Sequence, residues 1–539
     1  MRLKTMMNTL RRATLALACG GLLPLAAHAL TPQQALQLAE GDADARVAQL
    51  LQLAASDDAR AHALIRALAD DAVQIQDGHV LIVSGSAALD AVSGATVTLG
   101  SGAEEAVVNN RLRGALDSAL AGLDLFTGDA ARQREAAVTL QRGAFDDPNP
   151  AQLALLDRTL SPAQADRLDP DARESLLLAQ AALRLAAEDP ALRIAAAERL
   201  AQTSEPVVKA LLSQRLAAEA DPAVQAALRQ ALGAVERALA LSSALGELFT
   251  GVSLGSILLL AALGLAITYG LMGVINMAHG ELIMIGAYAT YLVQAAFRQY
   301  LPGAFDFYLL AALPLSFLAS ALVGAAMERS VLRFLYGRPL ETLLATWGIS
   351  LVLMQGVRSL FGAQNVGVEN PSWMSGGVTL LGGLTLPWNR IVIVAFAAAV
   401  LLAVALLISR TRLGLFVRGV TQNRPIAACM GVNTARIDTY AFALGSGIAG
   451  LAGCALSQIG NVGPDLGQNY IVDSFMVVVV GGVGQLAGTV YAALGLGLAN
   501  KLLEGWAGAV LAKIAVLVFI IVFIQKRPQG IFALKGRSA

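Results

Sequence analysis

Long apolar segments in the second half of the chain constrain its fold more than any other feature. Eight of them lie near residues 248–274, 282–297, 307–327, 343–361, 391–409, 440–459, 471–499 and 510–524. Most contain about 18–22 residues, close to the ~20 that an α-helix needs to cross the hydrocarbon core of a bilayer. The sequence therefore predicts that residues 245–539 form an all-α polytopic bundle of about seven or eight spans in a lipid bilayer.

The first half of the chain has a different composition. Charged residues make up only 14% of the whole chain, with 39 basic and 39 acidic side chains, but from about Thr31 to Arg237 they are frequent. Because soluble domains carry roughly a quarter charged residues, residues 30–240 are predicted to form a separate domain in water. The zero net charge removes the electrostatic basis for a nucleic-acid partner.

Residues 1–29 are predicted to be a cleavable signal peptide. A basic start that ends at Arg11-Arg12 precedes an apolar stretch, and Ala27-His28-Ala29 is an A-x-A-type cleavage site. The alternatives are a retained membrane helix and, on a weaker match, a lipoprotein box that ends at Cys19. Export would place residues 30–240 in the periplasm.

The charged domain is predicted to be mainly helical with one small β-hairpin near residues 73–83. The hairpin is indicated by two alternating stretches on either side of Asp77-Gly78, a dipeptide typical of type I′ turns. Asp189-Pro190 and Asp221-Pro222, 32 residues apart, each predict a helix start, because aspartate caps free amides and proline suits the first turn. This spacing fits HEAT-like repeats, which would serve as a docking surface or as a folded spacer.

Basic residues predict the orientation of the bundle. Arginines concentrate after the third and fifth apolar segments, and lysines and arginines follow the last one. The loop 363–390, by contrast, contains one basic residue, Arg390. The positive-inside rule therefore places the C-terminus in the cytoplasm and the charged domain in the periplasm of a bacterial inner membrane. Eight full crossings that start in the periplasm would return the C-terminus to the periplasm, against its basic charge. One segment is therefore predicted not to cross. The best candidate is 471–499, which the glycine-rich stretch 481–488 interrupts.

A second interruption, at residues 276–281, lies between the first two segments. Paired interrupted helices in the two halves of a bundle indicate a central transport site between inverted repeats. Polar side chains at membrane depth are costly and normally face the interior, although those in an interruption can instead satisfy broken helix ends. The predicted substrate-pathway residues are Asn276, His279, Glu281, Thr346, Ser457, Gln458 and Gln485.

The loop after the fifth segment predicts contact with a separate motor subunit. The chain has no G-x-x-x-x-G-K-[ST] motif for binding ATP, no nucleophile–base pair and no metal-ligand cluster, so it is not expected to be an enzyme or to hold a cofactor. Thr421 is predicted to cap a short helix that runs to Met430 and ends at Gly431 in the left-handed conformation. Such a helix can act as a lever between two spans; the alternative is an amphipathic helix on the headgroups.

Four ordered motifs resemble the inner-membrane permeases of branched-chain amino acid ABC transporters, the LivH-type family. They are Gly270–Tyr288, Arg418–Asn433, Gly481–Gly488 and Arg527–Phe532, and the resemblance covers roughly residues 245–535. It implies that the second motif contacts the ATPase. The residues implied in that contact are Arg418, Gln422, Asn423, Arg424, Ala427 and Gly431.

The region before the bundle, with its Asp77-Gly78 hairpin and the run from Val108 to Arg113, resembles the urea-transporting branch of this family. The resemblance implies a urea permease subunit that works with a second permease, two cytoplasmic ATPases that hydrolyse ATP, and a periplasmic solute-binding protein. Amide and hydroxyl groups suit neutral urea, whereas an amino acid needs partners for two charges. A branched-chain amino acid permease and a standalone facilitative channel are the alternatives.

Overall fold

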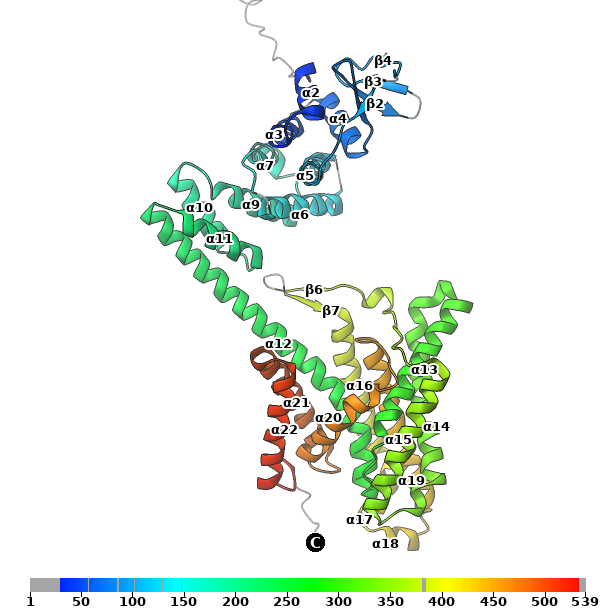
Figure 1. The fold of residues 1–539 in the computed structure, drawn as a ribbon. Helices are drawn as coiled ribbons and strands as arrows, with labels where there is room; N and C mark the ends of the chain where they lie inside the picture. The colour runs from blue at the N-terminus through cyan, green and yellow to red at the C-terminus, as the bar shows by residue number, and fades with distance from the viewer. Residues whose placement is uncertain are drawn as a thin grey trace, which may run out of the picture. The chain divides into compact units, whose positions relative to one another are not determined.

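The computed structural model describes residues 30–532 except 57, 85–86, 101, 128, 147 and 381–383, so the predicted signal peptide lies outside the described residues. The chain divides into two compact units, Met1–Leu239 and Ala240–Ala539. Both units are mainly helical, as predicted (Figure 1). Each unit is described by itself below.

The helices of the first unit start at capped positions. Asp189 accepts a hydrogen bond from the amide of Ala191, and Asp221 accepts one from the amide of Ala223, so the predicted helix starts at Pro190 and Pro222 are confirmed. The assignment to a repeat class stays a prediction. The helices are α2 (Pro32–Glu40), α3 (Ala43–Ala54), α4 (Ala59–Ala69), α5 (Asn110–Thr127), α6 (Ala130–Asp146), α7 (Gln152–Thr159), α8 (Pro162–Ala165), α9 (Pro170–Arg184), α10 (Pro190–Leu200), α11 (Pro206–Ala218) and the start of α12 (Pro222–Met272).

The predicted hairpin is part of a larger antiparallel sheet. Asp77 and Gly78 both have positive φ, 51° and 75°, as a type I′ turn requires. The strand order is β4-β3-β2-β1-β5. The three further strands are short and carry little apolar alternation, which is why the sequence predicted only one hairpin. The strands are β1 (Val73–Gln76), β2 (His79–Ser84), β3 (Ala87–Asp90), β4 (Thr96–Val97) and β5 (Glu104–Glu105).

The second unit is the apolar bundle. Among the described residues, eight helices are long and apolar enough to cross a membrane: α12, α13, α14, α15, α16, α19, α21 and α22. A two-stranded sheet lies at one end of the bundle, and α17, α18 and the end of α22 lie at the other (Figure 1). The elements after α12 are α13 (His279–Tyr300), η1 (Pro302–Phe307), α14 (Tyr308–Ser330), η2 (Leu332–Phe334), α15 (Pro339–Phe361), η3 (Ser372–Met374), β6 (Gly377–Thr379), β7 (Thr385–Pro387), α16 (Trp388–Arg410), α17 (Arg412–Gln422), α18 (Arg424–Cys429), α19 (Thr434–Ser457), α20 (Leu466–Gly481), α21 (Leu486–Ala507) and α22 (Ala509–Lys526).

The apolar segment 471–499 forms two helices, as its glycine-rich interruption predicted. The 16-residue α20 ends at Gly481, the chain turns through Gly482–Gln485, and α21 returns beside α20. Gly481 and Gly488 touch at the turn, since a Cβ on Gly481 would lie 2.5 Å from the carbonyl carbon of Gly488. The pair begins and ends at the same end of the bundle (Figure 1). The chain therefore leaves α21 on the side from which it entered α20.

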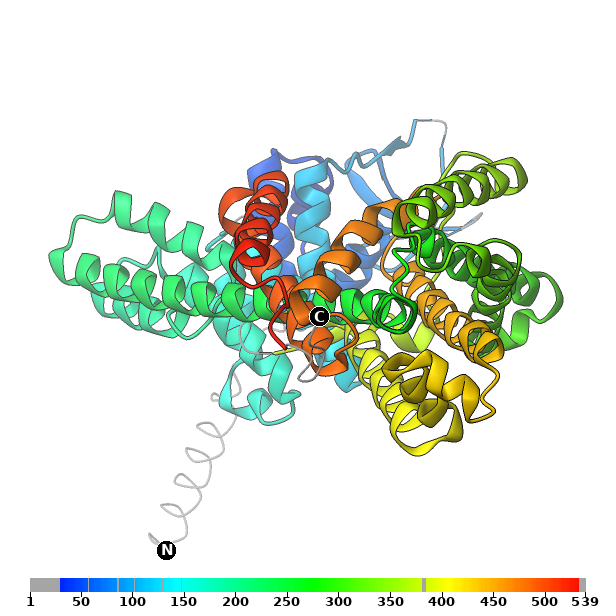
Figure 2. The ribbon, with the colours of Figure 1, turned by 90° about the horizontal axis from the view of Figure 1, so that it is seen from below.

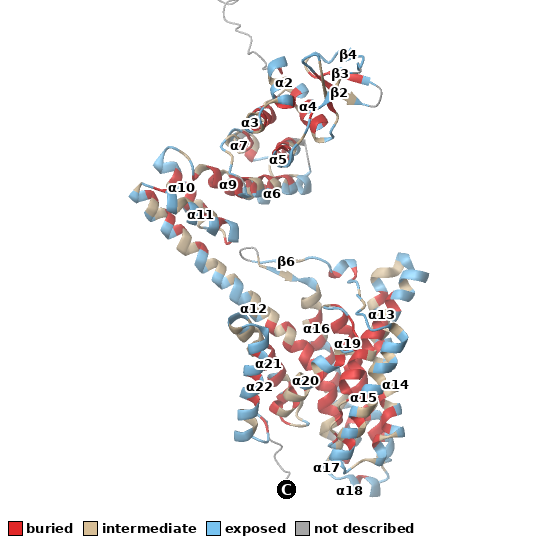
Figure 3. Cartoon of the chain, in the orientation of Figure 1, coloured by how far each residue is buried: buried red, intermediate tan, exposed pale blue. Residues whose placement is uncertain are grey.

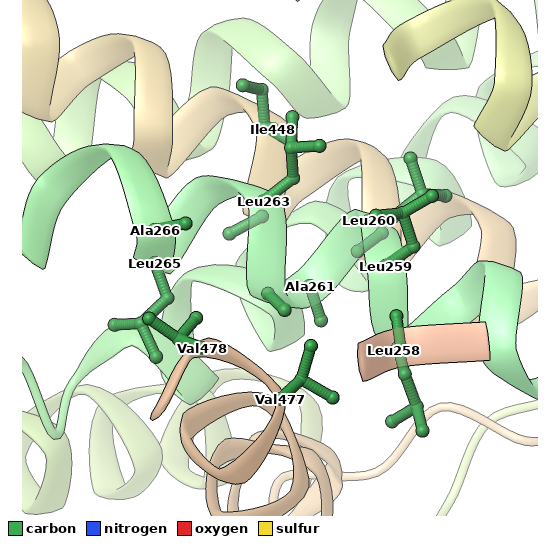
Figure 4. Close-up of a cluster of buried hydrophobic side chains, with 14 of the residues drawn as sticks. Leu258, Leu259, Leu260, Ala261, Leu263, Leu265, Ala266, Ile448, Val477 and Val478 are labelled. Atoms are coloured by element: carbon green, nitrogen blue, oxygen red, sulfur yellow. The ribbon is translucent and has the colours of Figure 1, made fainter. Parts of the chain in front are cut away.

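Helices α12 and α19 occupy the centre of the bundle. In its most apolar window, α19 is 78% buried, whereas α15, α16 and α22 are each 17% buried and present open faces (Figure 3). Leucines of α12 interlock with Ile448 of α19 and with Val477 and Val478 of α20 (Figure 4). Seen along the bundle, the hairpin of α21 and α22 lies at one edge and α14 and α15 lie at another (Figure 2).

Glycines allow α19 to lie very close to its neighbours. A Cβ on Gly453 would lie 1.9 Å from the carbonyl oxygen of Ile283 in α13, and a Cβ on Gly286 would lie 2.2 Å from the carbonyl oxygen of Gly450. Backbone cannot give way as a flexible side chain can, so α13 and α19 must separate if either glycine acquires a side chain. This is the close packing by small residues that is typical of membrane helices.

This packing predicts that Gly453→Ala lowers the free energy of unfolding by about 1–3 kcal/mol, the usual cost of overpacking. Gly348→Ala is the matched control, because a Cβ on Gly348 in α15 meets nothing within 4 Å; it should gain up to about 1 kcal/mol from helix propensity. Thermal unfolding of the two purified variants in detergent checks this. Equal melting temperatures would contradict the packing argument.

Candidate translocation pathway and coupling loop

The first interruption is a true break between two helices. α12 ends at Met272, Gly273 adopts a positive φ of 63°, and α13 begins at His279. Two polar side chains support the broken backbone: Asn276 accepts a hydrogen bond from the amide of Ala278 at 3.1 Å, and Thr346 of α15 accepts one from the amide of Met277 at 3.2 Å. Both side chains therefore serve the broken helix ends, where backbone groups lack helical partners.

The two ionisable residues of this break are fully buried. The Nε2 atom of His279 donates a hydrogen bond to the carbonyl of Ala261 at 2.9 Å, and Oε1 of Glu281 accepts one from Ser350 at 2.9 Å. A buried ionisable group at this position is expensive, so its occurrence indicates a functional region.

Several polar atoms in this region have no hydrogen-bond partner among the described residues. An unsatisfied buried polar atom costs about 1–3 kcal/mol, and native proteins normally supply a partner or a water molecule. Such atoms in an apolar bundle mark positions where water or a polar solute is favoured. The atoms are Nδ2 of Asn276, Nδ1 of His279, Oε2 of Glu281 and the hydroxyl of Tyr288.

The two interruptions of the bundle lie against each other. A Cβ on Gly270, at the end of α12, would lie 2.6 Å from Cα of Gly484 in the turn between α20 and α21. Gly280 at the start of α13 makes a similar contact with Gly467 at the start of α20, at 2.4 Å from its carbonyl oxygen. Gln485 belongs to this second turn, where its backbone carbonyl accepts a hydrogen bond from Thr489 at 3.0 Å.

Ser457 and Gln458 lie elsewhere, at the end of α19. Tyr308 donates a hydrogen bond to Oε1 of Gln458 at 3.1 Å, and Asn389 donates one to the Gln458 carbonyl at 3.2 Å. These contacts connect α19 with α14 and α16. The predicted pathway residues thus form one group at the first break, with Gln485 beside it. Ser457 and Gln458 form a separate pair.

A charged cavity that the sequence analysis missed lies between α12, α16 and α19–α22. Its volume is about 450 Å³, and its lining includes side chains of both charges. Asp473 interacts electrostatically with Lys513, and Oδ1 of Asn500 is buried without a partner in the described part of the chain. Asp473 and Lys513, two charges inside apolar segments, were the available signal. The charged lining residues are Arg390, Asp473, Lys501, Glu504 and Lys513.

The coupling loop differs from its prediction. It contains two helices, α17 and α18, and Thr421 is not a cap, because its hydroxyl donates to the carbonyl of Val417 within α17. Asn423 caps α18 by accepting a hydrogen bond from the amide of Ile426 at 3.1 Å. The reason is Pro425, which has no amide hydrogen for the carbonyl of Thr421 and so prevents α17 from continuing.

The predicted end of the short helix is confirmed. Gly431 has a φ of 85°, in the left-handed region, and Asn433 caps α19 by accepting a hydrogen bond from the amide of Arg436. Only four residues therefore separate α18 from α19, a central helix of the bundle.

Arg424 is not a free surface cation. It forms an ion pair with Asp438 of α19, and its guanidinium lies 5.4 Å from the ring centre of Tyr336. Tyr336 donates to Oε1 of Glu328 at 2.7 Å, and Thr439 donates to Oε2 of the same carboxylate at 2.6 Å. Burial, and then the hydrogen bond to Glu328, raise the pKa of Tyr336 and keep it a donor. We call these five residues the anchor network.

The other predicted coupling residues have mixed surroundings. Ala427 is buried, Gln422, Asn423 and Gly431 are exposed, and Arg418 donates to the carbonyl of Ile408. Two exposed apolar side chains of this loop were not among the predicted coupling residues, although the predicted short helix contains both positions. They are Ile426, 60% exposed, and Met430, 79% exposed.

Comparison with known proteins assigns the second unit to a family. The family described as "Branched-chain amino acid transport system / permease component" matches residues 247–525. The permease protein LivH of the high-affinity branched-chain amino acid transport system of Escherichia coli K12 is 29% identical over 297 residues, which cover 53% of this chain and 94% of that protein. LivH of Salmonella typhimurium gives the same identity and coverage.

The permease protein BraD of Pseudomonas aeruginosa is 27% identical over 293 residues, 53% of this chain and 95% of that protein. No solved structure gives a significant match. Most of the unmatched part of the chain lies before residue 247. With the family match covering half of the sequence, this membrane-spanning chain belongs to the permease family of branched-chain amino acid transport systems.

Proposed function

We propose that this chain is one of two permease subunits of a binding-protein-dependent ABC importer, and that its cargo is urea. In this proposal residues 1–29 direct export, residues 30–240 form a periplasmic domain, and the C-terminus is cytoplasmic. Two cytoplasmic ATPases and a periplasmic solute-binding protein complete the transporter, and this chain itself holds no cofactor.

The anchor network is the observation that carries the transport proposal. It connects α18 with α14, α19 and the segment before α15 through one ion pair and two hydrogen bonds, in which the Arg424 side chain is 43% exposed and the carboxylates of Asp438 and Glu328 are buried. Charge-assisted hydrogen bonds are short and strong, so a displacement of α18 is transmitted to these helices as a rigid movement. A helix that only lay on the lipid headgroups would not need contacts with the buried carboxylates of Asp438 and Glu328.

The cargo and partners are supported less directly. The polar groups at the first break, an amide, an imidazole, a carboxylate and hydroxyls, include the donors and acceptors that a neutral, polar solute requires. The resemblance of the region before the bundle to the urea branch supports urea. The relatives' descriptions as parts of transport systems support the partners.

Reconstitution tests whether transport requires the ATPases. In liposomes, the complete complex should accumulate labelled urea only with ATP, and this chain alone should give no urea flux above that of empty liposomes. A urea flux through the purified single chain would establish the facilitative-channel alternative. A complex whose ATP hydrolysis is insensitive to the loaded binding protein would contradict the importer.

The exposed apolar residues of the loop predict where the ATPase docks. Ile426→Ser and Met430→Ser together should lower ATP-driven uptake by at least about tenfold, because each buried side chain of this type contributes about 1.5–3 kcal/mol to a contact. Val107→Ser, at an equally exposed apolar position of the first unit, is the control. Copurification with the ATPase and uptake are the measurements.

Unchanged uptake in the double variant, with normal expression, would place the contact elsewhere. Arg424→Glu is a poor test of coupling, because it removes the partner of Asp438 and adds a third carboxylate near Glu328. Its loss of activity would not distinguish coupling from misfolding.

An amino acid cargo is the second candidate, and the charged cavity favours it. Asp473 is suited to an ammonium group, while Arg390 and Lys513 are suited to a carboxylate. Its volume lies in the range of small-molecule sites. Urea is neutral and forms no ion pair with these charged side chains.

Competition distinguishes the two cargoes. For a urea transporter we expect excess leucine to leave labelled urea uptake unchanged, and Asp473→Asn to change that uptake by less than about twofold, since no charged contact is lost. Inhibition by leucine, together with leucine uptake that falls at least about tenfold in Asp473→Asn, would replace urea by an amino acid.

A further inference from the structure

A second cavity, in the first unit, has a cationic lining. Its volume is about 370 Å³, and side chains from α4, α7, α8 and the segment before α9 converge on it. His62 and three arginines, Arg66, Arg158 and Arg167, contribute to the lining, and none of the described lining residues is Asp or Glu.

The cavity brings arginines together without a carboxylate among its described lining residues. Several other arginines of this unit do pair with carboxylates, as Arg184 does with Asp157 at 3.0 Å. Among the described residues, neither Arg66 nor Arg167 has a carboxylate within ion-pair distance. Both arginines are exposed, so their charges are available to an anion that enters the cavity, which would be attracted to both of them.

Other lining groups are held in position by their own hydrogen bonds. His62 Nε2 donates to the carbonyl of Ser56 at 2.8 Å, and Arg158 donates to the carbonyl of Ala55. Gln133 uses both ends of its amide, donating to the Leu125 carbonyl and accepting from the amide of Asp169. The cavity therefore has a preformed wall, as ligand sites normally do.

One polar atom shows what else a ligand must supply. Oε1 of Gln164, on α8, is buried and has no hydrogen-bond donor among the described residues. A ligand with a hydroxyl group would satisfy it, since a bare carboxylate can only accept.

We propose that this cavity binds a small organic oxyanion that carries at least two negative charges and a hydroxyl group. Arg66 and Arg167 bind its oxygens as charged donors, and Gln164 accepts its hydroxyl hydrogen. The cavity is large enough for a hydroxy-polycarboxylate. This site is independent of the identity of the transported solute.

Calorimetric titration of the full-length chain in nanodiscs of neutral lipid, at low salt and without divalent cations, tests this. Citrate should bind saturably at one site, and tricarballylate, which has the same three carboxylates and no hydroxyl, should bind several-fold more weakly. Arg66→Gln with Arg167→Gln should weaken citrate binding by at least about tenfold, as expected for lost charge-assisted bonds. Arg173→Gln, an exposed arginine outside the cavity, should leave it unchanged.

Two further measurements separate ligand binding from structure. Without citrate, the double variant should melt at or above the wild-type temperature, because neither arginine has an ion pair to lose among the described residues. Gln164→Met should abolish the preference for citrate over tricarballylate while both still bind. No saturable binding up to about 10 mM citrate or phosphate, a concentration tenfold above a millimolar dissociation constant, would overturn the proposal, as would equal citrate affinity in the double variant and Arg173→Gln.

Discussion

The need to satisfy backbone hydrogen bonds away from water is the constraint on which the bundle depends. Hydrocarbon offers no partner for a free amide or carbonyl, so a helix can be interrupted only where protein groups or water replace the lost bonds. Asn276 and Thr346 supply such groups at the first break. Glycines let the second turn pack against it, Gly484 beside Gly270. The places where helices fail are thus also the places where polar groups gather.

The same constraint applies to the anchor network. The buried carboxylates Glu328 and Asp438 are tolerated because each is matched by donors, and those donors come from different elements. A buried ion pair is a weak source of stability, but breaking one leaves an uncompensated charge. The ion pair between Arg424 and Asp438 therefore attaches α18 to α19 in this structure.

The two cavities serve different chemistry. The membrane cavity has side chains of both charges in its lining, Asp473 and Lys513 among them, so it suits a solute that itself carries both charges. The cavity of the first unit combines Arg66 with Arg167 and lacks balance within the described lining. Charge composition at a site, more than its size, decides which class of solute it favours.

The sequence by itself determined the helical class, the polar and apolar halves, both interruptions, and the caps at Asp189 and Gly431. Each of these features depends on residues that are close in the sequence: the length of an apolar segment, a proline that lacks an amide hydrogen, or a glycine that adopts the left-handed conformation. Tertiary structure alone decided that Arg424 is paired, that Gln458 lies apart from Asn276, and that five charges share one cavity. Those facts depend on which helices touch, and glycine contacts between distant segments set that pairing without leaving a local pattern.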